Sequence, residues 1–110
     1  MAETFKNNDG VAVTSTNQAI YTNSSGGEAI VISLRVTNVD GAADDTITAD
    51  VVDGTSGNSR LAFEMTVPAG SSIELAGSSK IVLEDGDKIE LTGGAASGDL
   101  EGFASVLEIT

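Results

Sequence analysis

Carboxylates are the only reactive side chains that are abundant in this chain. Its 110 residues include 17 Asp and Glu but no His and no Cys. The closest sets are Asp44 with Asp45, and Asp85 with Asp87. Calcium takes roughly six to eight oxygen ligands, and neither set has the spacing of an EF-hand loop. Calcium at Asp85 and Asp87 therefore stays open, and an ordinary solvated acidic turn is the alternative interpretation.

The residue types that are absent exclude several kinds of catalytic and metal site. Without His or Cys, the chain cannot build a serine or cysteine triad, or a zinc site of the usual nitrogen or sulfur kind. Paired carboxylates can hydrolyse glycosides, but only four aromatic residues are present to form a sugar platform. The glycine-rich segment Gly93–Gly98 lies between two expected strands and not at a helix start, so it does not predict a phosphate site. We therefore predict no enzyme, no cofactor and no metal-binding residue.

The charge excludes further partners. Five Lys and Arg against 17 Asp and Glu give a formal net charge of −12, whereas nucleic-acid binding needs clustered cations. The same acidity argues against docking on an anionic membrane. No run approaches the ~18 apolar residues of a membrane span, and residues 1–10 lack the hydrophobic centre of a signal peptide. We expect neither nucleic acid nor membrane as a partner.

Between its turn signals the chain alternates apolar and polar residues. Asp-Gly, a strong turn signal, occurs at Asp9, Asp40, Asp53 and Asp85. The segments between such turns have the period of two that is typical of strands. This pattern predicts an all-β protein: a single antiparallel β-sandwich or jelly-roll-like domain of about eight short strands over residues 11–110, preceded by a flexible N-terminal arm over residues 1–10. The residues expected to point inward are Leu34, Ile47, Leu61, Phe63, Ile89, Phe103 and Leu107.

Some apolar residues break the polar faces of the expected strands. Val31, Val52, Ala104 and Val106 lie on nominally outer faces. They indicate either strands that are covered on both faces, with Val chosen for its β-propensity, or a face that another subunit buries. Phe5 stands alone in the N-terminal arm, where it could pack on its own domain or on a neighbour. We take these five residues as the candidate assembly interface of a homo-oligomer, with a trimer favoured.

Several segments carry a resemblance to a known class of proteins. They are Val67–Ser72 (VPAGSS), Ile81–Ile89 (IVLEDGDKI), Ala96–Phe103 (ASGDLEGF), Ser105–Ile109 (SVLEI) and Val36–Asp45 (VTNVDGAADD). Together they resemble small virion structural proteins of tailed bacteriophages, of the marine and cyanobacterial type, over roughly residues 28–110. These segments are turn-and-strand patterns and not catalytic signatures.

The resemblance implies a non-enzymatic role in a phage particle, with synthesis in the host cytoplasm and assembly into the virion. A capsid decoration or cement protein that docks on the major capsid protein is the first expectation. A neck, tail or fibre-associated module that contacts other virion proteins or the host surface is the second. A calcium- or carbohydrate-binding β domain is the third.

Overall fold

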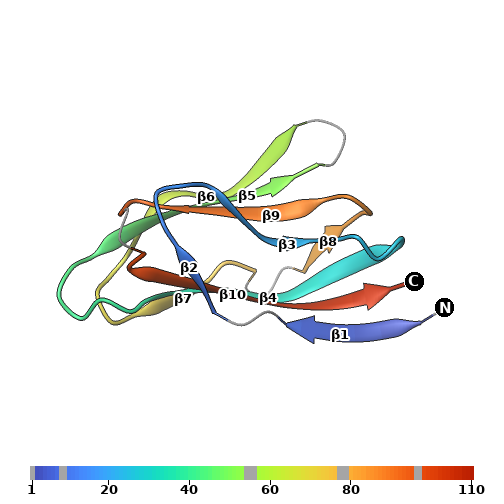
Figure 1. Ribbon diagram of the computed structural model, residues 1–110, viewed down its shortest axis with the longest axis horizontal. Helices are drawn as coiled ribbons and strands as arrows, with labels where there is room; N and C mark the ends of the chain where they lie inside the picture. Colours follow the sequence, from blue (N-terminus) through green and yellow to red (C-terminus); the bar gives the residue numbers. More distant parts are fainter. Residues whose placement is uncertain (1, 8–9, 54–56, 77–79, 96–97) are drawn as a thin grey trace.

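Two antiparallel sheets face each other in the computed structural model, which describes residues 2–7, 10–53, 57–76, 80–95 and 98–110. Figure 1 shows them as two layers, and the two termini lie close together at one end. The described residues contain ten strands and no helix, so the predicted all-β sandwich is confirmed, with ten strands in place of the expected eight or so. Consequently, no helix in this part of the chain could cross a lipid bilayer.

Sheet A, the lower layer in Figure 1, has six strands. They are β1 (Glu3–Asn7), β2 (Val11–Val13), β4 (Glu28–Asn38), β7 (Ser72–Glu74), β8 (Ile81–Leu83) and β10 (Leu100–Ile109). The long strands β4 and β10 pair along their whole length. β1 and β2 share the free side of β10, and β7 and β8 share the free side of β4.

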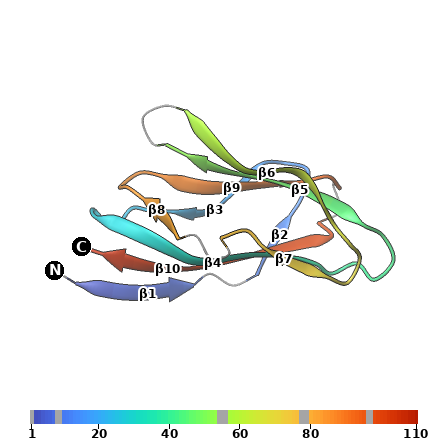
Figure 2. The same ribbon diagram turned by 180° about the vertical axis from the view of Figure 1, so that it is seen from behind.

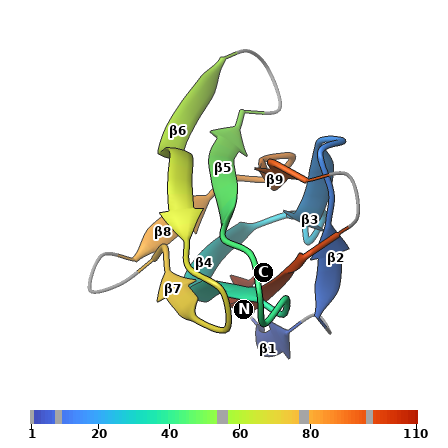
Figure 3. The ribbon, with the colours of Figure 1, turned by 90° about the vertical axis from the view of Figure 1, so that its left-hand side faces the viewer.

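Sheet B has four strands in the order β3 (Gln18–Thr22), β9 (Lys88–Gly93), β5 (Asp45–Val52) and β6 (Asn58–Val67). The β5–β6 pair extends beyond the rest of the sheet in both Figure 1 and Figure 2. The end-on view of Figure 3 shows sheet B above sheet A, with the chain crossing between them at the sides.

The N-terminal segment differs from the expected arm. Residues 3–7 form β1, which pairs in regular antiparallel register with the end of β10. Met1, Asn8 and Asp9 of the expected arm lie outside the described residues. The segment forms a strand because the C-terminal half of β10 offers it a full row of backbone partners, a long-range contact that local sequence does not encode.

Two of the turns read from the sequence have the expected geometry. At Glu84–Asp87, the backbone N–H of Asp87 donates to Glu84 at 3.0 Å, and Gly86 has a φ of 93°. After Pro68, the N–H of Ser71 donates back to the Pro68 carbonyl at 3.0 Å, and Gly70 has a φ of 73°. Only glycine adopts such positive φ angles without strain. The turns at Asp9 and Asp53 include residues outside the described part of the chain.

The core lies between the sheets and is built almost entirely from aliphatic side chains. Its largest fully buried members are Leu34, Ile47, Leu83, Ile89, Leu91 and Leu100. Leu34, Ile47 and Ile89 were expected there, and Leu61 is partly buried against the same cluster. The expectations for Phe63, Phe103 and Leu107 are wrong, since Phe63 is 61% exposed and the other two lie half-buried on the outer side of sheet A.

β-Bulges explain two of the changes of face. In β4, Ile32 is an extra residue between Val31, which pairs with Val106, and Ser33, which pairs with Ser105. Residues before the bulge therefore point inward at odd numbers, and residues after it at even numbers. In β6, Phe63 and Glu64 are opposite the single residue Thr48, and Glu64 has a φ of 47°. That bulge turns the Phe63 ring out to solvent.

The third change of face comes from packing and not from a bulge. The inward residues of β10 are small beside Leu91 and Ile20 of the opposite sheet. A Cβ added at Gly102 would lie 2.7 Å from Leu91 Cδ1 and 2.8 Å from Ile20 Cδ1. Gly102 and Ala104 therefore occupy the inward positions, and the bulky Phe103 and Leu107 face outward. Hydrophobicity alone favours the opposite orientation of β10.

Candidate assembly surface

The five residues expected at an assembly interface do not form one surface. Val31, Ala104 and Val106 are core residues, exposed by 0%, 2% and 2%. Their placement on an open face is therefore wrong, for the reasons of register and packing given above. Val52 is partly buried at the end of β5, in sheet B. Of these five residues, only Phe5 is largely exposed, at 74%, and it lies in β1 of sheet A.

The exposed apolar residues of sheet A instead form a row across its outer side. Phe5 of β1 is opposite Leu107 of β10, Leu107 is opposite Ile30 of β4, and Ile30 is opposite Val82 of β8. Directly opposed residues on neighbouring antiparallel strands point to the same face. The two end members are 74% and 58% exposed, and no described element lies beneath this layer in Figure 1. We call these four residues the outer apolar row.

Flanking residues enlarge the row and give it a polar border. Ile32 in the bulge is also exposed, and a hollow of about 290 Å³ lies beside it. The hollow is lined by Phe5, Lys6, Asn7, Ile32, Ser105 and Val106. On one side of the row, Ile109 is aligned with Glu3 and Glu28. An apolar centre with a polar border is the arrangement that protein interfaces have.

The outer side of sheet B differs in composition from that of sheet A. In β5 and β9, the outward positions opposite each other are Thr48 and Thr92. Thr46 and Glu90 also alternate with buried apolar residues in these strands. The two sheets are thus equally strand-like but present different surfaces. In sheet B the exposed large apolar residues are Phe63 and Met65 of β6. A preference for β-branched and aromatic residues in strands would act on both sheets, so it does not explain why a row of opposed apolar residues crosses sheet A and not β5 and β9.

A buried carboxylate connects β1, β10 and β3. Glu108 of β10 accepts a hydrogen bond from the Tyr21 hydroxyl at 2.6 Å and lies 3.1 Å from the Lys6 Nζ atom. The bond from Tyr21, supported by Lys6, lowers the pKa of Glu108 from its ordinary value. Burial, together with the bond to Glu108, raises the pKa of Tyr21 well above its ordinary value. The cluster holds charge between the sheets at one end of the sandwich and fixes β1 against it.

The acidic turns show no converging metal site. Among the described residues, no three Asp or Glu side chains lie close enough to hold a metal ion together. Asp85 Oδ1 accepts the Gly26 N–H at 3.0 Å, and Asp87 Oδ2 accepts the Glu84 N–H at 3.0 Å. These carboxylates thus have structural partners in the turn. The proposal of calcium at Asp85 and Asp87 gains no support from this geometry.

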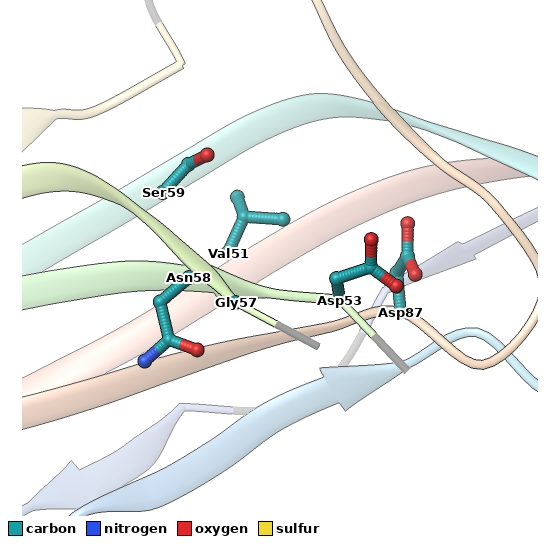
Figure 4. Close-up of a pocket in the computed structure, with 6 residues that line it drawn as sticks. All are labelled: Val51, Asp53, Gly57, Asn58, Ser59 and Asp87. Carbon is teal, nitrogen blue, oxygen red and sulfur yellow. The ribbon is translucent and has the colours of Figure 1, made fainter. Parts of the chain in front are cut away.

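A shallow pocket of about 310 Å³ lies near the same turn. It is lined by Val51, Asp53, Gly57, Asn58, Ser59 and Asp87. Figure 4 shows the carboxylates of Asp53 and Asp87 on one side of it, and the Asn58 amide on the other. Its described lining residues include no cation and no aromatic ring, and they give no support to the expected carbohydrate site.

The sequence itself indicates the outer apolar row, although a search for alternating apolar and polar residues does not detect it. In β10, apolar residues occupy both parities from Phe103 to Ile109. In β4, Ile30 and Ile32 alternate with buried Ala29 and Val31. Two-sided apolar strands indicate a second covered face. Which parity faces the core depends on the bulge and on Gly102, and neither can be located from hydrophobicity.

Comparisons with known proteins reach the fold and no further. No family model matches the chain, and no curated protein matches it. Among solved structures, one reported under "Bacillus endospore appendages form a novel family of disulfide-linked pili" shares 14% identity with a TM-score of 0.56, over 97% of this chain and 88% of that one. A chain of the infectious bursal disease virus Gx strain gives 12% and 0.57, over 96% of this chain. A chain of the icosahedral T13 particle of that virus gives 9% and 0.56. This chain spans about a third of the length of each viral chain, 31% and 30%. At these identities the chain shares a β-sandwich fold with a pilus protein and with proteins of a virus particle.

Proposed function

We propose that the chain is a non-enzymatic structural protein of a virus particle, and specifically a capsid decoration protein that docks on the major capsid protein of a tailed bacteriophage. The outer apolar row is the observation that carries this proposal. It covers all four strand positions of sheet A in register, from Phe5 to Val82. A monomer gains nothing from such a row, whereas a subunit that is buried against a large partner does.

Charge supports a role as one of many copies on a surface. The chain carries a net charge of −12, and the ion pairs of Lys6, Arg60 and Lys88 each engage one carboxylate. A strongly acidic protein stays soluble before assembly, and packaged DNA repels it. The likeness in fold to chains of a virus particle and of a pilus agrees with this proposal.

The second candidate role is a neck, tail or fibre-associated module. The apolar row would fit a docking site there equally well, and the two roles differ in copy number. Decoration of a head requires copies that follow the symmetry of its shell, whereas a neck or tail module occupies a small ring. A cryo-EM map of the particle that carries this protein, with the chain placed in density, distinguishes the two.

Docking itself is tested with a pair of matched variants. Val82→Asp places a charge at the exposed end of the outer apolar row. Thr66→Asp places the same charge on an exposed position of β6, in sheet B. Val82→Asp should reduce co-sedimentation of the protein with particles that lack it, because burying an unpaired carboxylate is costly. Thr66→Asp should bind as the parent does. Equal binding by both variants would contradict docking through sheet A.

A further inference from the structure

Strand β1 leaves one edge of sheet A open. It pairs with β10 on one side, and no strand of the described part of the chain lies on its other side. Ala2 and Thr110 exchange both of their backbone hydrogen bonds, at 2.6 and 2.8 Å. Bonded and non-bonded pairs alternate along an antiparallel ladder, so the backbone groups of Glu3, Phe5 and Asn7 point away from β10. All five residues of β1 are exposed.

The other edges of the two sheets are interrupted. β2, β7 and β8 have three residues each. β3 has a register shift between Ala19 and Tyr21. β6 has register shifts of its own, and Glu64 there adopts a left-handed conformation. Short, bulged or twisted edges are the usual protection against pairing with another chain. Among the described edge strands, β1 alone combines five residues with an unbroken register.

β1 also lacks the side chains that protect an edge. It has no proline, and its one cation, Lys6, is held 3.1 Å from Glu108. Its own charges, Glu3 and Lys6, sum to zero, and with Glu108 beside Lys6 the group carries one negative charge. This is a small share of the net charge of −12, so repulsion between two copies is weak at this edge.

We propose that β1 pairs with β1 of a second copy of this chain, antiparallel and about a twofold axis at Phe5. In this register Phe5 is opposite Phe5 of the partner subunit, and Glu3 is opposite Asn7 of the partner subunit. Each of these opposed pairs exchanges both backbone hydrogen bonds. A shift of the axis to Glu3 or to Lys6 would bring two like charges together, which destabilises a cross-strand pair.

The pairing joins two copies of sheet A into one continuous sheet. The outer apolar row of one copy then meets that of the other at the two Phe5 rings, which doubles its length. This inference deepens the proposed docking role and rests on it for its purpose. The contact itself is measured on the purified chain, without particles, so its failure is distinct from a failure of docking by Val82→Asp.

Single cysteines test the pairing, because the chain has none of its own. Opposed residues of a bonded pair have Cα atoms about 5.5 Å apart, within the roughly 4.4–6.8 Å range of disulfides. Under a mild oxidant, Phe5→Cys should form a covalent dimer at least about tenfold faster than Val82→Cys at equal concentration, since pairing raises the effective concentration of the thiols. Val82 is a matched control because it is exposed in the same row, at the far edge. Equal rates would overturn the proposal.

A second pair of variants tests the register. Two copies of Glu3 lie about 14 Å apart in the proposed pairing, at about 3.4 Å per residue. Glu3→Cys alone should therefore form no covalent cross-link although its β1 strands still pair, whereas a mixture of Glu3→Cys and Asn7→Cys should cross-link. Cross-linking of Glu3→Cys alone as fast as the mixture would indicate a parallel or shifted pairing and would overturn the proposal. A trimeric mass in sedimentation equilibrium, which the sequence favours, would also overturn it.

The role of the backbone is tested by adding Phe5→Pro to both members of that mixture. The Phe5 N–H points away from β10, so proline leaves the β1–β10 ladder intact, as edge strands tolerate. Proline removes the donor to the partner, and cross-linking should fall to the level of Glu3→Cys alone. The matched variant Phe5→Ala keeps the donor and should retain part of the cross-linking. Undiminished cross-linking with Phe5→Pro would overturn pairing through the backbone.

Discussion

Leu34→Ala and Phe63→Ala should differ sharply in stability, although alternation of the sequence places both residues in the core. Leu34 is fully buried between the sheets, and its backbone N–H donates to Glu74 Oε2 at 2.6 Å. Its strand is the centre of sheet A, with partners on both sides. The surroundings therefore relax little, and removing the side chain leaves a cavity. We expect a loss of about 3–5 kcal/mol in the free energy of unfolding.

Phe63 has no comparable environment. Its ring is 61% exposed, and the Arg60 guanidinium lies 4.7 Å from its centre. An exposed cation–π contact contributes about 0.5–1 kcal/mol, so Phe63→Ala should cost no more than about 1 kcal/mol. Phe103, half-buried on the outer face, should fall between the two. The assay is thermal and urea unfolding followed by circular dichroism, with the m-value as a check that the unfolded states are comparable.

The size of the difference makes the result decisive. A domain of this length has a total stability of about 5–15 kcal/mol, and 1 kcal/mol shifts its melting temperature by roughly 5 °C. Leu34→Ala should therefore melt roughly 15–25 °C below the parent, and Phe63→Ala within roughly 5 °C of it. Comparable losses from both variants would refute the bulge in β6 and the orientation that follows from it.

Three further predictions follow from the core and the charges. The pKa of the Glu108 carboxyl is lowered in the folded state. Its contribution to the free energy of unfolding is therefore present above the pKa of the unfolded chain and is lost as the pH falls through the pKa of the folded protein. The parent should lose more stability on acidification than Glu108→Gln does, and parallel pH profiles would contradict this. Gly102→Ala should destabilise by about 1–3 kcal/mol through overpacking against Leu91 and Ile20, and an unchanged melting temperature would show that the sheets can separate there. Added salt should raise the melting temperature, because about 0.15 M salt shortens the range of repulsion among the charges to about 8 Å; a melting temperature that falls with salt would contradict a destabilising net charge.

The sequence predicts the fold class because turn chemistry and apolar period agree along most of the chain. Asp85-Gly86 and Pro68-Ala69-Gly70 mark turns that the structure contains, and Ile47 and Ile89 lie on regular strands that alternate without interruption up to these positions. Local signals of this kind depend on a few neighbouring residues. They can therefore be recognised without knowledge of the partner strand.

The candidate surface could not be predicted in the same way, since it depends on which parity faces the core. In β4 one inserted residue, Ile32, reverses that parity, and Ile32 is as apolar as its neighbours. In β10 the parity depends on Gly102, whose lack of a side chain matters only because Leu91 and Ile20 of the opposite sheet lie against it. β1 could not be predicted from local sequence because its partner strand, β10, lies more than 90 residues later in the chain. Phe5, for example, pairs with Leu107. These determinants are all long-range.

The orientation of β10 connects the core to the outer surface. At Gly102 the side chains of Leu91 and Ile20 leave no room for a Cβ, so the large Phe103 beside it lies on the outside. This packing explains the orientation of β10, but it does not explain why its outward positions hold the apolar residues Phe103, Leu107 and Ile109. In sheet B, the outward positions of β5 hold threonine, which has a comparable β-propensity and keeps its hydroxyl in water. Sheet B has exposed Phe63 and Met65 in β6, but among the described residues only sheet A has apolar residues that oppose one another across four strands and end at the open edge of β1. This arrangement supports the proposed burial against another protein surface.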